Sequence, residues 1–144
     1  MSLRQILYAS QAKLRDPDKE CRDILAGARP LNEANEVTGL LLYVRNGTFL
    51  QALEGTAAAL EATMRRIRAD GRHTNVTVIM DAESPARDFE EWSMGFHATD
   101  AGELMGLSGY KQVDGTADAD DLLRDGPVVA RIMRSLYAAN AGHI

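Results

Sequence analysis

Cysteine is almost absent from this sequence, since Cys21 is the only one. A single cysteine excludes an intrachain disulfide and a cysteine-rich metal site. The chain also has no basic run, and its net charge of −5 makes it poorly suited to bind a phosphate backbone. No apolar run approaches the ~20 residues of a membrane span, and no signal peptide is visible. We therefore expect a soluble, cytoplasmic protein that binds neither nucleic acid nor membrane.

The common enzyme signatures are missing as well. The sequence contains no G-x-G-x-x-G, no Walker loop, no G-x-S-x-G and no H-E-x-x-H. The three histidines, His73, His97 and His143, are scattered without metal-ligand spacing. Cys21 lies on the apolar stripe of an expected helix, where a thiol is usually a small hydrophobic side chain. These absences predict a protein that is not an enzyme.

Hydrophobic spacing and turn residues predict an α+β domain. The expected strands are 3–10, 36–44, 47–54, 75–81 and 87–98, and the expected helices are 15–29 and 56–70. Asp16 and Pro17 suit the start of the first helix, and Pro30 is expected to break or kink it. The β-α-β-β-α-β order with an extra strand is typical of a ferredoxin-like fold, with both helices on one sheet face.

The sequence after this domain has a different character. We expect residues 1–98 to form the domain and residues 99–144 to form a C-terminal helical extension. An acidic linker at 115–121 precedes a final helix at 126–140. That helix carries a continuous apolar stripe, which we expect to pack on the sheet or on a partner.

Several polar side chains stand where apolar ones are expected. Gln51 shares a strand face with Phe49 and Leu53. Asn32 would lie on the apolar stripe of the first helix if that helix continued past Pro30. A buried amide without partners costs roughly 1–3 kcal/mol per unsatisfied group. Taken singly, each such residue has an ordinary structural explanation, so only the set as a whole points to a site.

Four segments carry a resemblance to a known family. They are ILYAS at 6–10, ARPLNEANEVTGLLLYVRNGTFLQALEG at 28–55, IRADGRH at 67–73 and FEEWSMGF at 89–96. Together, in this order and at this spacing, they resemble the BLUF domain, a flavin-binding sensor of blue light. The resemblance covers about the first hundred residues.

The resemblance implies a noncovalently bound flavin, with FAD as the first candidate and FMN or riboflavin as alternatives. It implies that Tyr8 is the photoactive tyrosine and Gln51 the glutamine that switches its hydrogen bonds. The other residues that it assigns are Asn32 at the pyrimidine edge, Asp70, Arg72 and His73 near the ribityl and phosphate end, and Trp92 and Met94 as a pair that exchanges places near Gln51. Leu31 differs from the family pattern, because some BLUF members have a polar residue at this position that contacts the flavin.

The resulting hypothesis is a blue-light photoreceptor that signals to a separate downstream protein, because 144 residues leave no room for an attached catalytic domain. A homo-oligomer is expected. One alternative is a light-independent interaction module that kept the fold and lost the flavin. Another is a small enzyme of the acylphosphatase type, which would need an anion-cradling loop that the segment YASQAKLRD does not provide.

Overall fold

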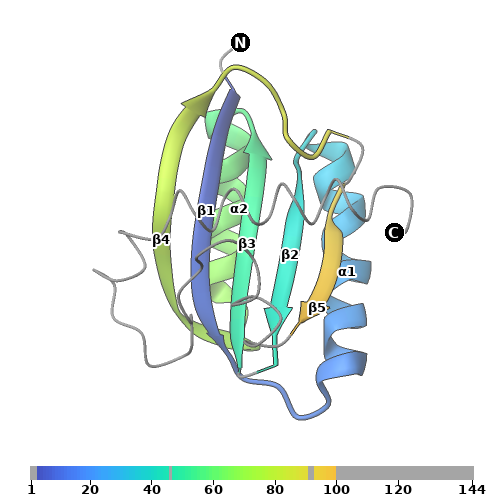
Figure 1. The fold of residues 1–144 in the computed structure, drawn as a ribbon. Helices are drawn as coiled ribbons and strands as arrows, with labels where there is room; N and C mark the ends of the chain where they lie inside the picture. Colours follow the sequence, from blue (N-terminus) through green and yellow to red (C-terminus); the bar gives the residue numbers. More distant parts are fainter. Residues whose placement is uncertain (1–2, 46, 91–92, 100–144) are drawn as a thin grey trace.

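The computed structural model describes residues 3–45, 47–90 and 93–99. The elements follow in the order β1 (Leu3–Ala12), α1 (Pro17–Ala34), β2 (Thr38–Val44), β3 (Thr48–Gly55), α2 (Ala57–Ala69), β4 (His73–Ser84) and β5 (Gly95–Thr99). The strands form one sheet in the order β4-β1-β3-β2-β5. Both helices lie on the same face of this sheet (Figure 1). The α+β, ferredoxin-like prediction is confirmed, whereas the expected C-terminal helices lie outside the described residues.

The sheet is mixed. β3 pairs antiparallel with β1 and β2, and β4 pairs antiparallel with β1. β5 lies parallel to β2 at the sheet edge. The central strand, β3, and its neighbour β2 are buried almost throughout, as expected for strands that are covered on both faces.

Both helices begin at the residues predicted from the sequence. The Asp16 carboxylate accepts a hydrogen bond from the Lys19 N–H at 3.4 Å, and Pro17 takes the first helical position. The Thr56 hydroxyl accepts from the Ala59 N–H at 3.3 Å. Within the described residues, neither helix is long and apolar enough to cross a membrane.

Pro30 was expected to break or kink the first helix, and the expected break, with a helix end at residue 29, is wrong. α1 runs to Ala34 with Pro30 inside it. Proline lacks an N–H and removes one helical hydrogen bond, so the last turn needs support from elsewhere. Arg29 Nε donates to the Met94 carbonyl at 3.0 Å, and Asn32 Nδ2 donates to the Ser93 carbonyl at 2.8 Å. These contacts from a distant segment hold the turn that the local sequence disfavours.

The last predicted strand is also too long. Residues 87–98 were expected to form one strand, but β5 begins only at Gly95. The backbone N–H groups of Asp88 and Phe89 donate to the Glu54 carboxylate. These N–H groups are therefore paired with a side chain and not with the backbone of a neighbouring strand. Met94 therefore lies just before β5, and Trp92 lies outside the described residues.

Two glycines have definite roles in the hairpin of β2 and β3. Gly47 closes the turn with a φ of +101°, a conformation that favours glycine, and its N–H donates to the Val44 carbonyl at 2.9 Å. Gly39 lies where a Cβ would come within 2.0 Å of the Ala52 carbonyl oxygen. The hairpin predicted from Arg45–Gly47 is confirmed, since Val44 pairs with Thr48.

The two faces of the sheet bury different sets of side chains. On the helix side, Cys21 and Leu25 of α1 and Leu60 and Met64 of α2 pack on the sheet in one apolar cluster. Side chains on a strand alternate between faces, so the neighbours of these sheet residues point the other way. That second face buries Leu7, Leu40, Leu42 and Leu50 almost completely.

Candidate functional site

A cavity of about 280 Å³ opens on the helix side of the sheet. Residues from α1, from α2 and the turn after it, and from β1, β2, β3 and the start of β4 form its walls. They are Tyr8, Ile24, Gly27, Ala28, Leu31, Asn32, Leu41, Phe49, Gln51, Leu53, Thr63, Arg66, Ile67, Asp70, Arg72 and His73. The wall is mostly apolar, with two amides and a few charged groups, which is the usual composition of a small-molecule site.

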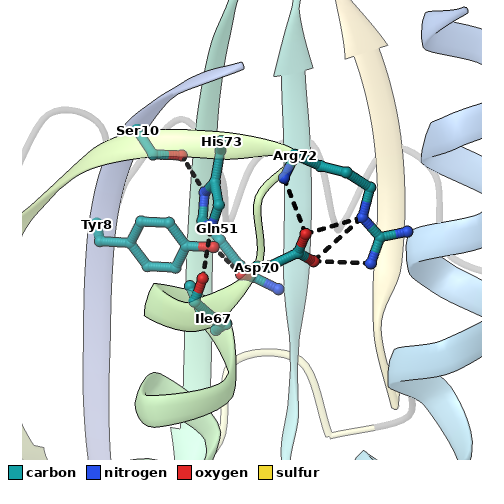
Figure 2. Close-up of polar contacts among 7 residues, drawn as sticks. All are labelled: Tyr8, Ser10, Gln51, Ile67, Asp70, Arg72 and His73. Carbon is teal, nitrogen blue, oxygen red and sulfur yellow. Dashed lines mark hydrogen bonds and ion pairs between the residues drawn. The ribbon is translucent and has the colours of Figure 1, made fainter. Parts of the chain in front are cut away.

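Tyr8 and Gln51 face each other across β1 and β3. Their backbones are register partners, so both side chains emerge on the same face. The Tyr8 hydroxyl donates a hydrogen bond to Gln51 Oε1 (Figure 2). Tyr8 is 3% exposed and Gln51 is 6% exposed. A polar pair of this kind, shielded from water at the wall of a cavity, is the central feature of the site.

The other end of the Gln51 amide contacts a weak acceptor. Gln51 Nε2 donates to Met94 Sδ at 3.2 Å, and a thioether sulfur accepts hydrogen bonds only weakly. Among the described residues, the Met94 sulfur is the hydrogen-bond acceptor of Gln51 Nε2. The amide is therefore well paired at its oxygen and poorly paired at its nitrogen, which leaves donor capacity beside the cavity.

The environment keeps the Tyr8 hydroxyl protonated. Burial raises the pKa of Tyr8 far above its ordinary value of 10.0, and the negative charge of Asp70 raises it further. Both causes disfavour the phenolate, because the charged form would lose hydration and meet a like charge. Tyr8 therefore stays protonated and is a hydrogen-bond donor to Gln51 over the whole physiological pH range.

Asp70 and Arg72 form an ion pair at one end of the cavity. Asp70 follows the last residue of α2, and its carboxylate accepts from the Arg72 backbone N–H and from Nε and Nη2 of the guanidinium (Figure 2). Hydrogen bonding to Arg72 holds the pKa of Asp70 below its usual range. The paired geometry orients Arg72 at the mouth of the cavity, where it can meet an anion.

His73 connects three elements beside Tyr8. Its Nε2 lies 2.6 Å from the Ile67 carbonyl, and its Nδ1 lies 2.7 Å from Ser10 Oγ (Figure 2). A carbonyl can only accept, so Nε2 carries a proton. The His73 ring centroid lies 6.2 Å from that of Tyr8 and also 6.2 Å from that of Phe49. The imidazole thus ties β1, β4 and α2 together at this wall.

Asn32 lies on the turn of α1 that follows Pro30. Its side chain is 2% exposed, lines the cavity, and donates to the Ser93 carbonyl. Leu31 lines the cavity as well but is 45% exposed, in keeping with an apolar residue at its rim. The continuation of the helix past Pro30 is what brings Asn32 to the cavity.

Cys21, the single cysteine of the chain, does not line the cavity. It is buried in the apolar cluster between α1 and the sheet. Burial is the main cause that raises the pKa of its thiol. This agrees with the prediction that Cys21 acts as a small hydrophobic residue.

Comparison with known proteins identifies the family of this chain and agrees with its fold. The family model described as "Sensors of blue-light using FAD" matches residues 3–95. The chain belongs to the BLUF family. In the BLUF protein BlrB, whose dark-state structure is known, 97% of the chain matches 96% of this one, with 31% identity and a TM-score of 0.74.

Curated relatives share only the BLUF region. The photoactivated adenylate cyclase subunit beta of Euglena gracilis is 36% identical over 94 residues, which cover 65% of this chain and 11% of the relative. The antirepressor BluF of Escherichia coli is 32% identical over 93 residues, which cover 64% of this chain and 23% of the relative. This chain therefore matches about a tenth to a quarter of the length of these relatives.

The structure gathers most of the predicted site residues around one cavity. Six of them line it, namely Tyr8, Asn32, Gln51, Asp70, Arg72 and His73. Met94 contacts Gln51 from the segment before β5, whereas Trp92 lies outside the described residues.

The predicted set of site residues omitted three polar residues at or beside this wall. Thr63 and Arg66 line the cavity, and Ser10 holds His73. Thr63 could have been found, because it lies three residues after Leu60 on the buried stripe of α2. Ser10 carried no signal, since its partner is far away in the chain.

The residues present fit a flavin, which is the cofactor of BLUF domains. The cavity volume of about 280 Å³ lies just below the ~300–1,000 Å³ range of small-molecule sites, a size suited to a ring system. Its apolar walls suit the faces of the ring, and the amides of Asn32 and Gln51 suit a polar edge. Arg66 places positive charge at the cavity wall, which suits the anionic part of a flavin nucleotide, while the charge of Arg72 is paired with Asp70.

Proposed function

We propose that this chain is a blue-light photoreceptor in which Tyr8, Gln51 and Met94 form the switch. The observation that carries this proposal is the buried hydrogen bond from the Tyr8 hydroxyl to Gln51 Oε1 at the cavity wall. Its polarity is defined, because Tyr8 donates and the amide oxygen accepts. If the amide turned over, its nitrogen would face Tyr8 and its oxygen would face Met94 or the cavity.

The residues of the chain can perform this exchange without large motion. When bound, a flavin absorbs blue light and in its excited state accepts an electron. Tyr8 is a buried phenol that is hydrogen-bonded to Gln51, so it would supply an electron to a bound excited flavin and a proton along the Gln51 amide. Both would return to Tyr8 when the charge pair recombines, which leaves no net change in oxidation state. Rotation or tautomerisation of that amide then reverses which neighbour receives a hydrogen bond. The sulfur of Met94 adapts readily, because thioethers are soft and weakly hydrogen-bonded.

The same residues would hold the cofactor. Asn32 and Gln51 offer amide groups to the polar edge of the ring, and the Asp70–Arg72 pair with His73 lies toward the ribityl and phosphate end. We propose FAD as the flavin, following the description of the family; Arg66 at the cavity wall is suited to a phosphate group, while Arg72 is paired with Asp70. FMN and riboflavin are the alternative cofactors, and chromatography of the released flavin distinguishes them from FAD.

We further propose that the chain has no catalytic activity of its own and signals in the cytoplasm to a separate protein. Similarity along 97% of BlrB supports this organisation, whereas the named relatives from Euglena gracilis are adenylate cyclase subunits. Residues 99–144 are proposed to form a helical extension on the second sheet face or on a partner, within a homo-oligomer. The apolar character of that face, with Leu40, Leu42 and Leu50, supports such a cover.

The deciding experiment is an absorption spectrum of the purified protein before and after blue light. We expect a yellow protein with one noncovalent flavin per chain and a small, reversible red shift. Release of the cofactor by heat, followed by chromatography, distinguishes FAD, FMN and riboflavin. The matched control is Gln51→Leu, which should keep the flavin, since leucine suits the face of Phe49 and Leu53, and lose the shift. A protein that stays colourless after incubation with all three flavins would contradict the proposal and favour a light-independent interaction module.

The route of the signal can be measured separately. Hydrogen exchange in the dark and under light should change more in residues 97–140 than in α1, because β5 follows Met94 directly. Identical exchange across 97–140 in both states, together with a normal red shift, would show that the signal leaves by another surface.

A further inference from the structure

Glu54 is a carboxylate that is 1% exposed yet lies outside the cavity. It is three residues from Gln51 on β3, so it points to the opposite face of the sheet. Its cross-strand neighbours there are Gln5 on β1 and Thr38 on β2. The proposed light switch gives this buried charge no role.

The described residues satisfy both carboxylate oxygens of Glu54. Oε1 accepts from Thr38 Oγ1 at 3.0 Å and from the Phe89 N–H at 2.9 Å. Oε2 accepts from Gln5 Nε2 at 3.2 Å and from the Asp88 N–H. An ionised carboxylate has about four acceptor positions, and here donors fill all of them. Two of these donors belong to the backbone of the segment after β4.

Arg87 strengthens the same attachment. Its Nη1 donates to Thr38 Oγ1 at 2.8 Å and to the Glu54 carbonyl at 3.1 Å, and its Nη2 donates to the Glu36 carbonyl at 2.8 Å. The segment from Arg87 to Phe89 is therefore fixed to the second face of the sheet by side-chain hydrogen bonds. A segment held in this way resists displacement, because each buried bond that opens leaves a polar group without a partner.

Five residues after Phe89, the chain has reached the helix side. The Met94 sulfur contacts Gln51, its carbonyl accepts from Arg29 Nε, and its side chain packs in the helix-side cluster. Five residues span at most about 18 Å. Thus one strand, β3, touches both ends of this short crossing: Gln51 contacts Met94 on one face, and Glu54 contacts Asp88 and Phe89 on the other.

We propose that Glu54 is a positioning residue for the light switch, which holds Met94 against Gln51 through the segment that begins at Arg87. The inference rests on the proposed function, since it adds a residue to that switch. Glu54 acts through Met94 and touches neither the cavity nor its occupant. A carboxylate is required because every neighbour on both oxygens is a donor. Glutamine would turn its NH₂ group toward donors and lose at least one pair of hydrogen bonds.

The first test is carried out in the dark. The methyl group of Met94 is observed by NMR in protein labelled with ¹³C at the methionine methyls. We expect Glu54→Gln to shift or broaden the Met94 signal. The control Asp81→Asn removes the carboxylate that pairs with Arg4 at 2.6 Å on the same sheet, and we expect an unchanged signal. A Met94 signal identical in Glu54→Gln and in the parent chain would overturn the inference, whether or not the protein responds to light.

The second test is a double-mutant cycle on the dark recovery of the red-shifted state. With Met94 held less firmly, the Gln51 amide returns more easily, so Glu54→Gln should recover about threefold faster or more, and Asp81→Asn should recover at the parent rate. In a Met94→Ala background, Glu54→Gln should change recovery little. Equal effects of Glu54→Gln in both backgrounds would show that it does not act through Met94.

A milder variant covers the case in which Glu54→Gln does not fold. Thr38→Val keeps the shape of the side chain and removes the hydroxyl that bridges Glu54 and Arg87. We expect smaller changes in the same two readouts, and no change in either would overturn the inference. The failure of the proposed function is distinct, because it would appear as a parent protein without flavin or without a red shift.

Discussion

Replacing Tyr8 by phenylalanine removes a single oxygen atom from the site. The ring keeps its packing against the sheet, while the hydrogen bond to Gln51 Oε1 is lost. Because Tyr8 and Gln51 are both buried, water does not replace the missing donor. The variant therefore isolates the hydroxyl, and with it the proton that the proposed switch needs.

The size of the effect on stability follows from this geometry. A net hydrogen bond contributes about 0.5–1.5 kcal/mol, and a buried acceptor left without a donor costs about 1–3 kcal/mol. We expect Tyr8→Phe to lower the free energy of unfolding by ~2 kcal/mol, a fall in Tm of about 6–8 °C for a domain of this size. The double variant Tyr8→Phe/Gln51→Leu removes both partners and should be less destabilised than Tyr8→Phe alone, with a coupling of about 1–2 kcal/mol.

Unfolding is followed in the dark by circular dichroism with FAD at a fixed excess. The FAD affinity of each variant is measured separately, because a ligand that binds only the native state adds to its stability. The same samples are then illuminated, and we expect Tyr8→Phe to keep the flavin and lose the red shift. If the effects of Tyr8→Phe and Gln51→Leu on the free energy of unfolding simply add, the two side chains are not energetically coupled, which would contradict the predicted contribution of their hydrogen bond. A full red shift in Tyr8→Phe would refute the role of Tyr8 as proton donor.

Three further predictions use other features of the fold. Glu36 has a φ of 55°, a left-handed backbone conformation that favours glycine. Glu36→Gly should therefore raise the free energy of unfolding in urea by ~0.5–1 kcal/mol, and a less stable variant would show that the backbone at Glu36 is not strained. Gly39→Ala should lower that free energy by about 2–3 kcal/mol, because its Cβ would lie 2.0 Å from the Ala52 oxygen and 3.2 Å from Met94 Cε; a neutral result would mean that the strands do not approach so closely. The pKa of Tyr8 is raised above 10.0, so its contribution is complete below about pH 10 and is lost as the pH rises further. Tyr8→Phe should therefore show a shallower alkaline decline in Tm, and parallel curves for the two proteins would contradict the raised pKa.

The local sequence was sufficient to predict the elements and the faces of their side chains. Asp16, Pro17 and Thr56 mark helix starts because capping acts within one turn of helix. The alternation of β3 placed Gln51 beside Phe49 and Leu53, and the structure places all three at the cavity wall. The pattern of segments also predicted the BLUF family, which the family model confirms. These features depend on spacing along the chain, which a sequence displays directly.

Tertiary contacts decided what the local sequence could not. Pro30 predicts a helix end, yet α1 continues because Arg29 and Asn32 find carbonyl partners in residues 93 and 94. Residues 87–89 were predicted as strand, yet Asp88 and Phe89 donate to the Glu54 carboxylate. In each case, a buried polar group is satisfied by a partner more than thirty residues away.

The cavity has the same origin. Its walls come from four strands, both helices and the turn after α2, so its size and the meeting of Tyr8, Asn32 and Arg72 depend on how those elements pack. Sequence spacing states which residues share a face, because side-chain direction is set by the local backbone. Sequence spacing does not predict which distant donor bonds to which acceptor. These pairs form only in the compact chain, where each buried polar group needs a hydrogen-bond partner.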